Sequence, residues 1–222
     1  FSSSHCSCTP DSEDEVGEFS EKCWSCNARK KKRRSLFCGE CKLIQPALTM
    51  QSNYFDIFDM PRRFQLDVKV LSKAFQKLQM QIHPDRYQAK SKNEQRFSSE
   101  NSAMVTHAFH TLKEPSLRGK YLLSMYGRAC SESGGTTPNQ YLMWVMEMQE
   151  RAMESPEDDL PDVLCDMEVV AEELASELDN IFDGKREPTA EELDRATDVC
   201  QKLNYIHRIE QQILDRMPRT QS

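Results

Sequence analysis

The sequence predicts a mainly α-helical protein in three parts: a small four-cysteine zinc module, an antiparallel helix hairpin with short flanking helices, and a C-terminal antiparallel three-helix bundle. Three observations carry this prediction. Two C-x-x-C pairs lie close together within residues 21–48. Apolar residues recur at helical spacing on both sides of a short polar loop at residues 83–85. Beyond residue 138, three further helical patterns are joined by short connections, which is the signature of an antiparallel bundle.

Composition narrows the classes of protein that the chain can belong to. Of its 222 residues, 38% are hydrophobic and 29% are charged, and no apolar run reaches the length of a membrane span. The net charge of −7 argues against a general nucleic-acid binder. We therefore expect neither a membrane nor a nucleic-acid partner. The sequence starts at Phe1 rather than at methionine, so we expect a processed or truncated chain whose targeting peptide is missing from view.

Residues 1–20 are rich in serine and acidic residues and are predicted to be a disordered leader. The four-cysteine module follows at residues 21–48, and eleven residues separate its two C-x-x-C pairs. Each pair places two sulfurs on one tight turn, and two facing turns make a tetrahedral site suited to one zinc ion. The module is too small to bury a core, so the metal must supply its folding energy. The expected ligands are Cys23, Cys26, Cys38 and Cys41.

A basic run at residues 29–34 lies between the two cysteine pairs. It has two interpretations: a nucleic-acid patch or nuclear localisation signal, and a solvated hairpin loop. We favour the solvated loop, because the acidic leader and the acidic remainder of the chain offer counter-charges.

The central part begins with a short aromatic helix at residues 53–58 and continues as a helix hairpin. One apolar stripe precedes the loop and a second follows it. The first consists of Leu66, Val70, Leu71, Ala74, Phe75, Leu78 and Ile82, and the second of Phe97, Asn101, Met104, Val105, Ala108 and Leu112. Pro84 fixes its own φ and biases His83 away from helix, so His83-Pro84-Asp85 is expected at the exposed tip. Such residues bury nothing, which indicates recognition rather than folding.

The residues around this tip resemble a J domain. The matching features are the helix–loop–helix order, a basic stripe of Lys69, Lys73 and Lys77, and the run from 111 to 123 that includes Arg118. J domains dock on a DnaK-type heat-shock chaperone and trigger its ATP hydrolysis. The resemblance implies that His83, Pro84 and Asp85 are the stimulatory residues and that the lysines meet an acidic surface. We assign residues 49–127 to this domain, with Gly127 ending its last helix, and residues 128–137 to a connector.

The remaining residues, 138–222, are predicted to form the three-helix bundle. Thr137 and Pro138 suit the start of a helix that runs to about residue 154. A second helix spans about 161–182 and is closed by Gly184. Thr189 and Glu192 form a capping box for the third helix. The expected core is Leu164, Met167, Ala171, Leu174, Leu178 and Ile181 on the second helix and Leu193, Ala196, Cys200, Leu203, Ile206, Ile213 and Met217 on the third, and Cys165 is also expected to be buried.

The first bundle helix carries two apolar faces, although one suffices to join a bundle. Tyr141, Trp144, Val145, Met148 and Ala152 lie on one side, and Leu142, Met143, Met146 and Met153 lie on another with Glu150 among them. The second face is either a partner surface rimmed by carboxylates or a face covered by another part of the chain. The pattern alone leaves both interpretations open.

A J domain followed by such a bundle resembles the HscB family of iron–sulfur cluster co-chaperones, and the cysteine module resembles that of the animal mitochondrial form. The resemblance implies a non-enzymatic adaptor that delivers an IscU-type scaffold protein to the chaperone, with the mitochondrial matrix as its main location and the cytoplasm as a second one. The positions matching the family's scaffold-binding patch are Leu142, Met143, Met146, Glu147, Glu150 and Tyr205. Tyr205 faces away from Leu203 and Ile206, so the pattern itself predicts that it is non-core. Trp144 either fills the core or enlarges the patch.

Two other classes of function remain open from the residues alone. A zinc-ribbon nucleic-acid binder, suggested by the basic run, would bind with a steep salt dependence. A thiol oxidoreductase using a C-x-x-C pair would need one reactive thiol with a low pKa, whereas four metal-ligated thiolates are inert.

Overall fold

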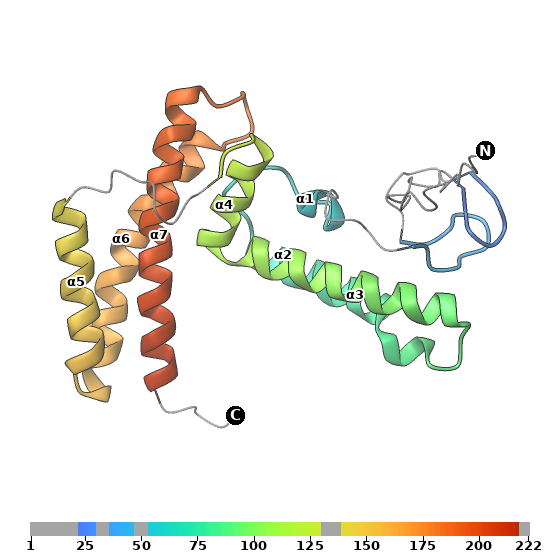
Figure 1. Cartoon of the computed structure of the whole chain (residues 1–222), viewed down its shortest axis with the longest axis horizontal. Coiled ribbons are helices and arrows are strands. Elements are labelled where there is room, and N and C mark those ends of the chain that lie inside the picture. The colour runs from blue at the N-terminus through green and yellow to red at the C-terminus, as the bar shows by residue number, and fades with distance from the viewer. Residues whose placement is uncertain (1–21, 30–35, 47–52, 130–138, 218–222) are drawn as a thin grey trace, which may run out of the picture.

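The computed structural model describes residues 22–29, 36–46, 53–129 and 139–217. The predicted leader, the basic run beyond Arg29 and the helix start at residues 137–138 lie outside these ranges. The chain is elongated, with the bundle at one end, and the hairpin extends from it to the other end, where the four-cysteine module lies beside the loop end of the hairpin (Figure 1). The elements are α1 (Tyr54–Ile57), α2 (Val68–Ile82), the 3₁₀ turn η1 (Pro84–Tyr87), α3 (Lys92–Lys113), α4 (Pro115–Met125), α5 (Asn139–Glu154), the 3₁₀ turn η2 (Glu157–Asp159), α6 (Leu160–Ile181) and α7 (Ala190–Arg216).

The hairpin of α2 and α3 is confirmed. The side chain of Asp67 caps α2, and a capping box of Ser91 and Glu94 begins α3. The two helices pack along their length around buried apolar residues, as predicted. Val70 is the exception, with 49% of its surface exposed. A strict four-residue repeat drifts by about 40° per step on an α-helix, so three steps carry Val70 out of the face that holds Ile82.

The three-helix bundle is also confirmed. α6 and α7 pack together, α5 packs against both, and the capping box of Thr189 and Glu192 begins α7. Cys200 is fully buried, as expected, but the prediction that Cys165 is buried is wrong, because its side chain is exposed. Cys165 is two residues from the buried Val163, about 200° around α6, and so it faces solvent. None of the described helices combines the length and apolarity needed to cross a membrane.

The J domain and the bundle share a tightly packed joint. α4 lies against α7, and a Cβ placed on Gly119 would sit only 2.6 Å from the Sγ atom of Cys200. The backbone N–H of Phe64 donates to the carbonyl oxygen of Phe182 (3.2 Å), and that of Gln65 donates to Oδ1 of Asp179 (3.1 Å). Buried side chains therefore run without a break from the hairpin into the bundle, which makes one rigid body of the two domains.

Arg118 reinforces this joint from the J-domain side. Its guanidinium lies 4.6 Å from the ring centroid of Phe64, and Nη1 donates to the carbonyl oxygen of Leu112 at 2.7 Å. Burial lowers the pKa of Arg118 to about 10 even though Glu114 and Asp179 act in the opposite direction. A guanidinium with that pKa stays charged at neutral pH, so the joint contains a buried cation held by a ring and a carbonyl.

The close approach of α4 to α7 gives a first testable prediction. Gly119→Val should lower the free energy of unfolding by about 1–3 kcal/mol, because the branched side chain forces the two helices apart. Thermal unfolding followed by circular dichroism measures this as a fall of several degrees in the midpoint. Leu117→Val is the matched control, since it places the same side chain at an exposed position of α4. Equal midpoints for the two variants would contradict the tight joint.

Candidate metal centre and partner surfaces

The four-cysteine module consists of two matching turns. The backbone N–H of Cys23 donates to Ala28 and that of Cys38 donates to Leu43, each at 2.9 Å. The residue after each second cysteine is left-handed, with φ of 60° at Asn27 and 62° at Lys42. An antiparallel bridge flanks each turn, joining Lys22 to Arg29 and Phe37 to Ile44. Because both turns have the same backbone conformation, their cysteine sulfurs face one another.

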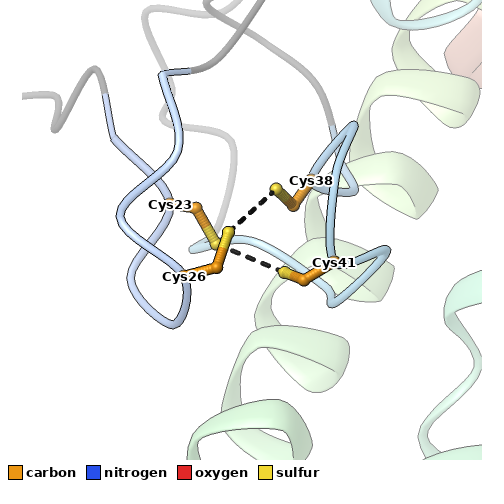
Figure 2. A group of neighbouring side chains, drawn as sticks. All are labelled: Cys23, Cys26, Cys38 and Cys41. Carbon is orange, nitrogen blue, oxygen red and sulfur yellow. Dashed lines mark hydrogen bonds between the residues drawn. The ribbon is translucent and has the colours of Figure 1, made fainter.

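The four sulfur atoms have the spacing of a tetrahedral metal site. The Sγ atoms of Cys23 and Cys41 are 3.6 Å apart and those of Cys26 and Cys38 are 3.7 Å apart, as the dashed lines in Figure 2 mark. All four lie within 4.8 Å of one another. Sulfurs bound at about 2.3 Å around one ion would be separated by about 3.8 Å. The predicted ligand set is thus brought together, and an S₄ donor set of this size fits a metal ion.

The surroundings of one cysteine on each turn, Cys23 and Cys38, favour the thiolate form that binds metals. Burial acts to raise the pKa of the Cys23 thiol, but hydrogen bonds from the backbone N–H groups of Cys26 and Ser25 and from the Gln45 side chain lower it to about 6. The pKa of Cys38 is also lowered, chiefly by backbone N–H groups of its own turn. Oriented N–H groups stabilise negative sulfur, so ligands on both turns are prepared for deprotonation.

The module packs on α3 of the J domain through residues that the sequence did not single out as functional. Nε1 of Trp24 donates to the carbonyl oxygen of Ile44 (2.7 Å), and its ring meets that of Phe97 edge to face at 5.7 Å. Nδ2 of Asn101 donates to the carbonyl oxygen of Gln45 at 3.0 Å. The sequence did contain one signal: Asn101 is a polar residue within an apolar stripe, and a buried amide needs a polar partner.

The loop between α2 and α3 displays His83 and Asp85 to solvent. Their side chains are 53% and 74% exposed, and Nδ1 of His83 accepts a hydrogen bond from the backbone N–H of Asp85 at 3.3 Å. Two neighbouring side chains tie the loop back onto α2: Arg86 donates to the carbonyl oxygen of Met80 and Tyr87 to that of Gln81, at 2.6 and 3.2 Å. The predicted exposed tip is therefore held in place by residues other than His83 and Asp85.

The three lysines of the predicted basic stripe are all exposed on α2. Lys69, Lys73 and Lys77 follow one another at a spacing of four residues, so they form a ridge on the outside of the hairpin. Met80 continues the surface toward the tip and is 66% exposed, although no pattern in the sequence singles it out. The arrangement combines a ridge of positive charge with a rigid tip on one helix hairpin.

The second apolar face of α5 is open to solvent. Met143, Met146 and Met153 are 71%, 70% and 66% exposed, and Glu147 and Glu150 are exposed beside them. The interpretation that another part of the chain covers this face is therefore wrong for the three methionines. Methionine side chains adapt in shape, and an apolar face of this kind is typical of a partner-binding surface.

Three residues at the edge of this face are partly buried. Trp144 packs against the core and against Tyr141, with ring centroids 5.4 Å apart, so its ring belongs mainly to the core. Leu142 is half-buried. Tyr205 also packs partly against the core, so the expectation of a wholly non-core position is wrong. A tyrosine is long enough to fill a groove between helices with its ring while one edge remains accessible.

Comparison with known proteins agrees with this architecture. A family model described as the HSCB C-terminal oligomerisation domain matches residues 137–214. The "Iron-sulfur cluster co-chaperone protein HscB" of Mus musculus is 28% identical over 197 residues, covering 86% of this chain and 80% of the mouse protein. The human protein of that name is 27% identical over 213 residues, covering 94% and 88%. The Arabidopsis thaliana homolog is 29% identical over 195 residues, covering 88% and 74%.

Solved structures share the fold. The crystal structure of human co-chaperone protein HscB matches with a TM-score of 0.73 and 27% identity, covering 88% of this chain and 98% of the human one. HscB from Vibrio cholerae matches with a TM-score of 0.59 and 26% identity over 74% of this chain and 97% of its own. The fold and site together define a J-domain protein with a C-terminal helical bundle. Within that class, the chain is similar to the HscB co-chaperones.

Proposed function

We propose that this chain is a co-chaperone of iron–sulfur cluster biogenesis, a non-enzymatic adaptor that connects an IscU-type scaffold protein to a DnaK-type mitochondrial chaperone. One observation carries the proposal: two exposed surfaces of different chemistry, the tip of the hairpin and the methionine face of α5, belong to one rigid body. Joining two partners through one molecule raises their effective concentration toward each other without any new contact between them.

The hairpin supplies the chaperone-facing surface. Lys69, Lys73 and Lys77 attract an acidic surface and orient the encounter, since exposed charges act mainly on association rate. The rigid tip then presents His83, Pro84 and Asp85 to the chaperone without further ordering. The chaperone performs the ATP hydrolysis, and this chain accelerates it.

The bundle supplies the scaffold-facing surface. It consists of Leu142, Met143, Met146, Glu147, Glu150 and Tyr205. The exposed methionines provide apolar anchors, and the two carboxylates at the rim select a partner whose matching surface is basic. The exposed side of α5 gives a binding partner free access to this patch.

The four-cysteine module holds one structural zinc ion in this proposal. Zinc accepts four thiolates in tetrahedral geometry and performs no redox chemistry, so it acts as a cross-link between the two turns. Purified protein should contain one zinc per chain, with a Zn–S distance near 2.3 Å in X-ray absorption. Stripping the zinc should disorder residues 21–48 while circular dichroism shows little loss of helix, because the helical cores do not contain the metal.

Metal-free protein with disulfides Cys23–Cys26 and Cys38–Cys41 would contradict the zinc prediction and would favour the thiol oxidoreductase alternative. Double replacement Cys165→Ser and Cys6→Ser is the control, because neither residue is an expected ligand and the zinc content should be unchanged.

The likeness to the mouse, human and plant HscB proteins supports a place in the mitochondrial matrix, and the cytoplasm is a second location in this proposal. Neither nucleic acid nor a membrane surface is a partner in this proposal, because the net charge of the chain is −7.

Capture of both partners by one chain tests the proposed function. The intact protein is immobilised and exposed to purified scaffold, purified chaperone with ATP, or both together. Retention of both partners on the same molecule at once is expected, since the two surfaces lie on separate helices, α2 and α5. Retention of neither partner, or competition between them, would contradict the adaptor function.

A further inference from the structure

The four-cysteine module is built into the J domain close to its chaperone-facing tip. Ile44 is 1% exposed and belongs to the same apolar cluster as the hairpin residues. Gln45 is likewise 1% exposed, although it is polar, and Trp24 lies against Phe97 in the first half of α3. The side-chain Oε1 of Gln45 has no hydrogen-bond partner among the described residues, but its Nε2 and its backbone carbonyl oxygen do, and those partners show what the position does.

Gln45 connects the sulfur cluster to α3. Its side-chain Nε2 donates to Sγ of Cys23 at 3.4 Å and to the carbonyl oxygen of Leu43 at 2.9 Å. Its own carbonyl oxygen accepts from Nδ2 of Asn101 at 3.0 Å. Asn101 is fully buried, and the same Nδ2 donates to the carbonyl oxygen of Phe97 at 2.8 Å. Two hydrogen bonds thus connect a candidate metal ligand to the side chain of Asn101 on α3, and a third connects that side chain to the backbone of the helix.

The same segment of α3 holds the start of the chaperone-facing tip. Oγ of Ser98 donates to the carbonyl oxygen of Ile82 at 2.6 Å, and Ile82 directly precedes His83. Ser98 is fully buried. Ser98 and Asn101 are three residues apart, so they lie on the same side of α3, one fixing the tip and the other receiving the module.

Metal loading strengthens this connection for a physical reason. A metal-bound sulfur is a fixed, negatively charged acceptor, and hydrogen bonds to charged acceptors are shorter and stronger than those to neutral ones. A module without metal lacks the core needed to stay folded, and its loss would leave the Asn101 amide without the Gln45 acceptor. The order of α3 around residues 97–101 therefore depends on whether the sulfurs hold their ion.

We propose that Gln45 and Asn101 are positioning residues through which the metal-loaded module orders α3 and the adjoining His83-Pro84-Asp85 tip, so that metal occupancy regulates stimulation of the chaperone. This inference rests on the proposed function, because it takes the module to be a metal site and the tip to be the stimulatory surface.

Hydrogen–deuterium exchange of the full chain, with zinc bound and with zinc removed by a chelator, tests the inference. Removal of zinc should speed the exchange of backbone amides in residues 83–101 by about tenfold, which corresponds to about 1.4 kcal/mol. Amides of α6 and α7 serve as the internal reference and should not change. The rate of chaperone ATP hydrolysis stimulated by the same samples should fall several-fold on zinc removal.

Asn101→Ala removes the hydrogen bond between α3 and Gln45 but leaves the four cysteines unchanged. It therefore distinguishes the effect of this hydrogen bond from the effect of the metal. This variant should still bind one zinc, but its residues 83–101 should exchange as fast with zinc as without it. Ser102→Ala is the matched control, because it removes a hydrogen bond to Gln79 on α2 and leaves the contact with the module intact. In that control the tenfold dependence on zinc should persist.

Two results would overturn the inference. The first is faster exchange confined to residues 22–46 when zinc is removed, and the second is an undiminished zinc dependence in Asn101→Ala. Either result would leave the proposed function standing. A chain that binds no zinc would overturn both the metal assignment and the inference, and normal stimulation by a His83→Gln variant would overturn the assignment of the tip.

Discussion

His83→Gln should abolish stimulation of the chaperone's ATP hydrolysis while leaving the fold intact. The imidazole is more than half exposed, and the hydrogen bond that it receives comes from the adjacent Asp85 backbone. The tip is held instead by Arg86, Tyr87 and Ser98, none of which is changed. Single-turnover ATP hydrolysis measures the stimulation, and the thermal midpoint from circular dichroism measures the fold.

Ala89→Gln is the matched control for this variant. It introduces the same side chain at an exposed position just beyond the tip and should stimulate like the original chain. Normal stimulation by His83→Gln would show that the J domain does not act through its tip. A large fall in the midpoint would show that the tripeptide is structural rather than functional.

Joint replacement of Leu142, Met146 and Tyr205 by alanine should weaken scaffold binding by a factor of at least about 100. Buried apolar anchors of this kind contribute on the order of 1–2 kcal/mol each to an interface, and each 1.4 kcal/mol is a factor of ten in affinity. Isothermal titration with the purified scaffold measures the change. The variant should keep its basal stimulation of the chaperone, because the hairpin is untouched, and should lose the extra stimulation that the scaffold adds.

The partial burial of Leu142 and Tyr205 calls for two controls. Met143→Ala with Met146→Ala removes only exposed anchors, and so it should weaken binding without changing the thermal midpoint. Val169→Ala with Leu214→Ala removes exposed apolar side chains of α6 and α7 outside the patch and should leave binding unchanged. Unchanged binding in the triple variant, or weakening by the second control alone, would place the scaffold surface elsewhere.

Most of the fold could be predicted from local patterns in the sequence. Helices α2, α3, α6 and α7 follow from apolar spacing, and a capping box also marks the start of α7, because both signals depend on residues within one or two turns. The four-cysteine cluster follows from the spacing of the cysteines for the same reason. Periodicity fails where a face drifts or turns, so Val70 and Cys165 were predicted to be buried although they face solvent.

Contacts between distant parts of the chain could not be predicted in the same way. The sequence does not show that Gly119 meets Cys200, because the missing side chain of glycine has no pattern of its own. It does not show that Gln45 reaches Asn101 across 56 positions either. For the candidate sites, the sequence identified the cysteines, the tip and the α5 face. The structure adds that the module packs on α3 and that Tyr205 is partly buried.

The most direct test of the adaptor function is the rate of chaperone ATP hydrolysis measured with this chain, the scaffold, or both together. We expect the chain alone to raise the rate, and the chain with the scaffold to raise it well beyond the sum of their separate effects, because one rigid molecule brings the two partners together. Both effects should disappear with His83→Gln, and only the additional one should disappear with the triple alanine variant. A rate that is the same with and without this chain, or one that the scaffold raises equally in its absence, would contradict the account.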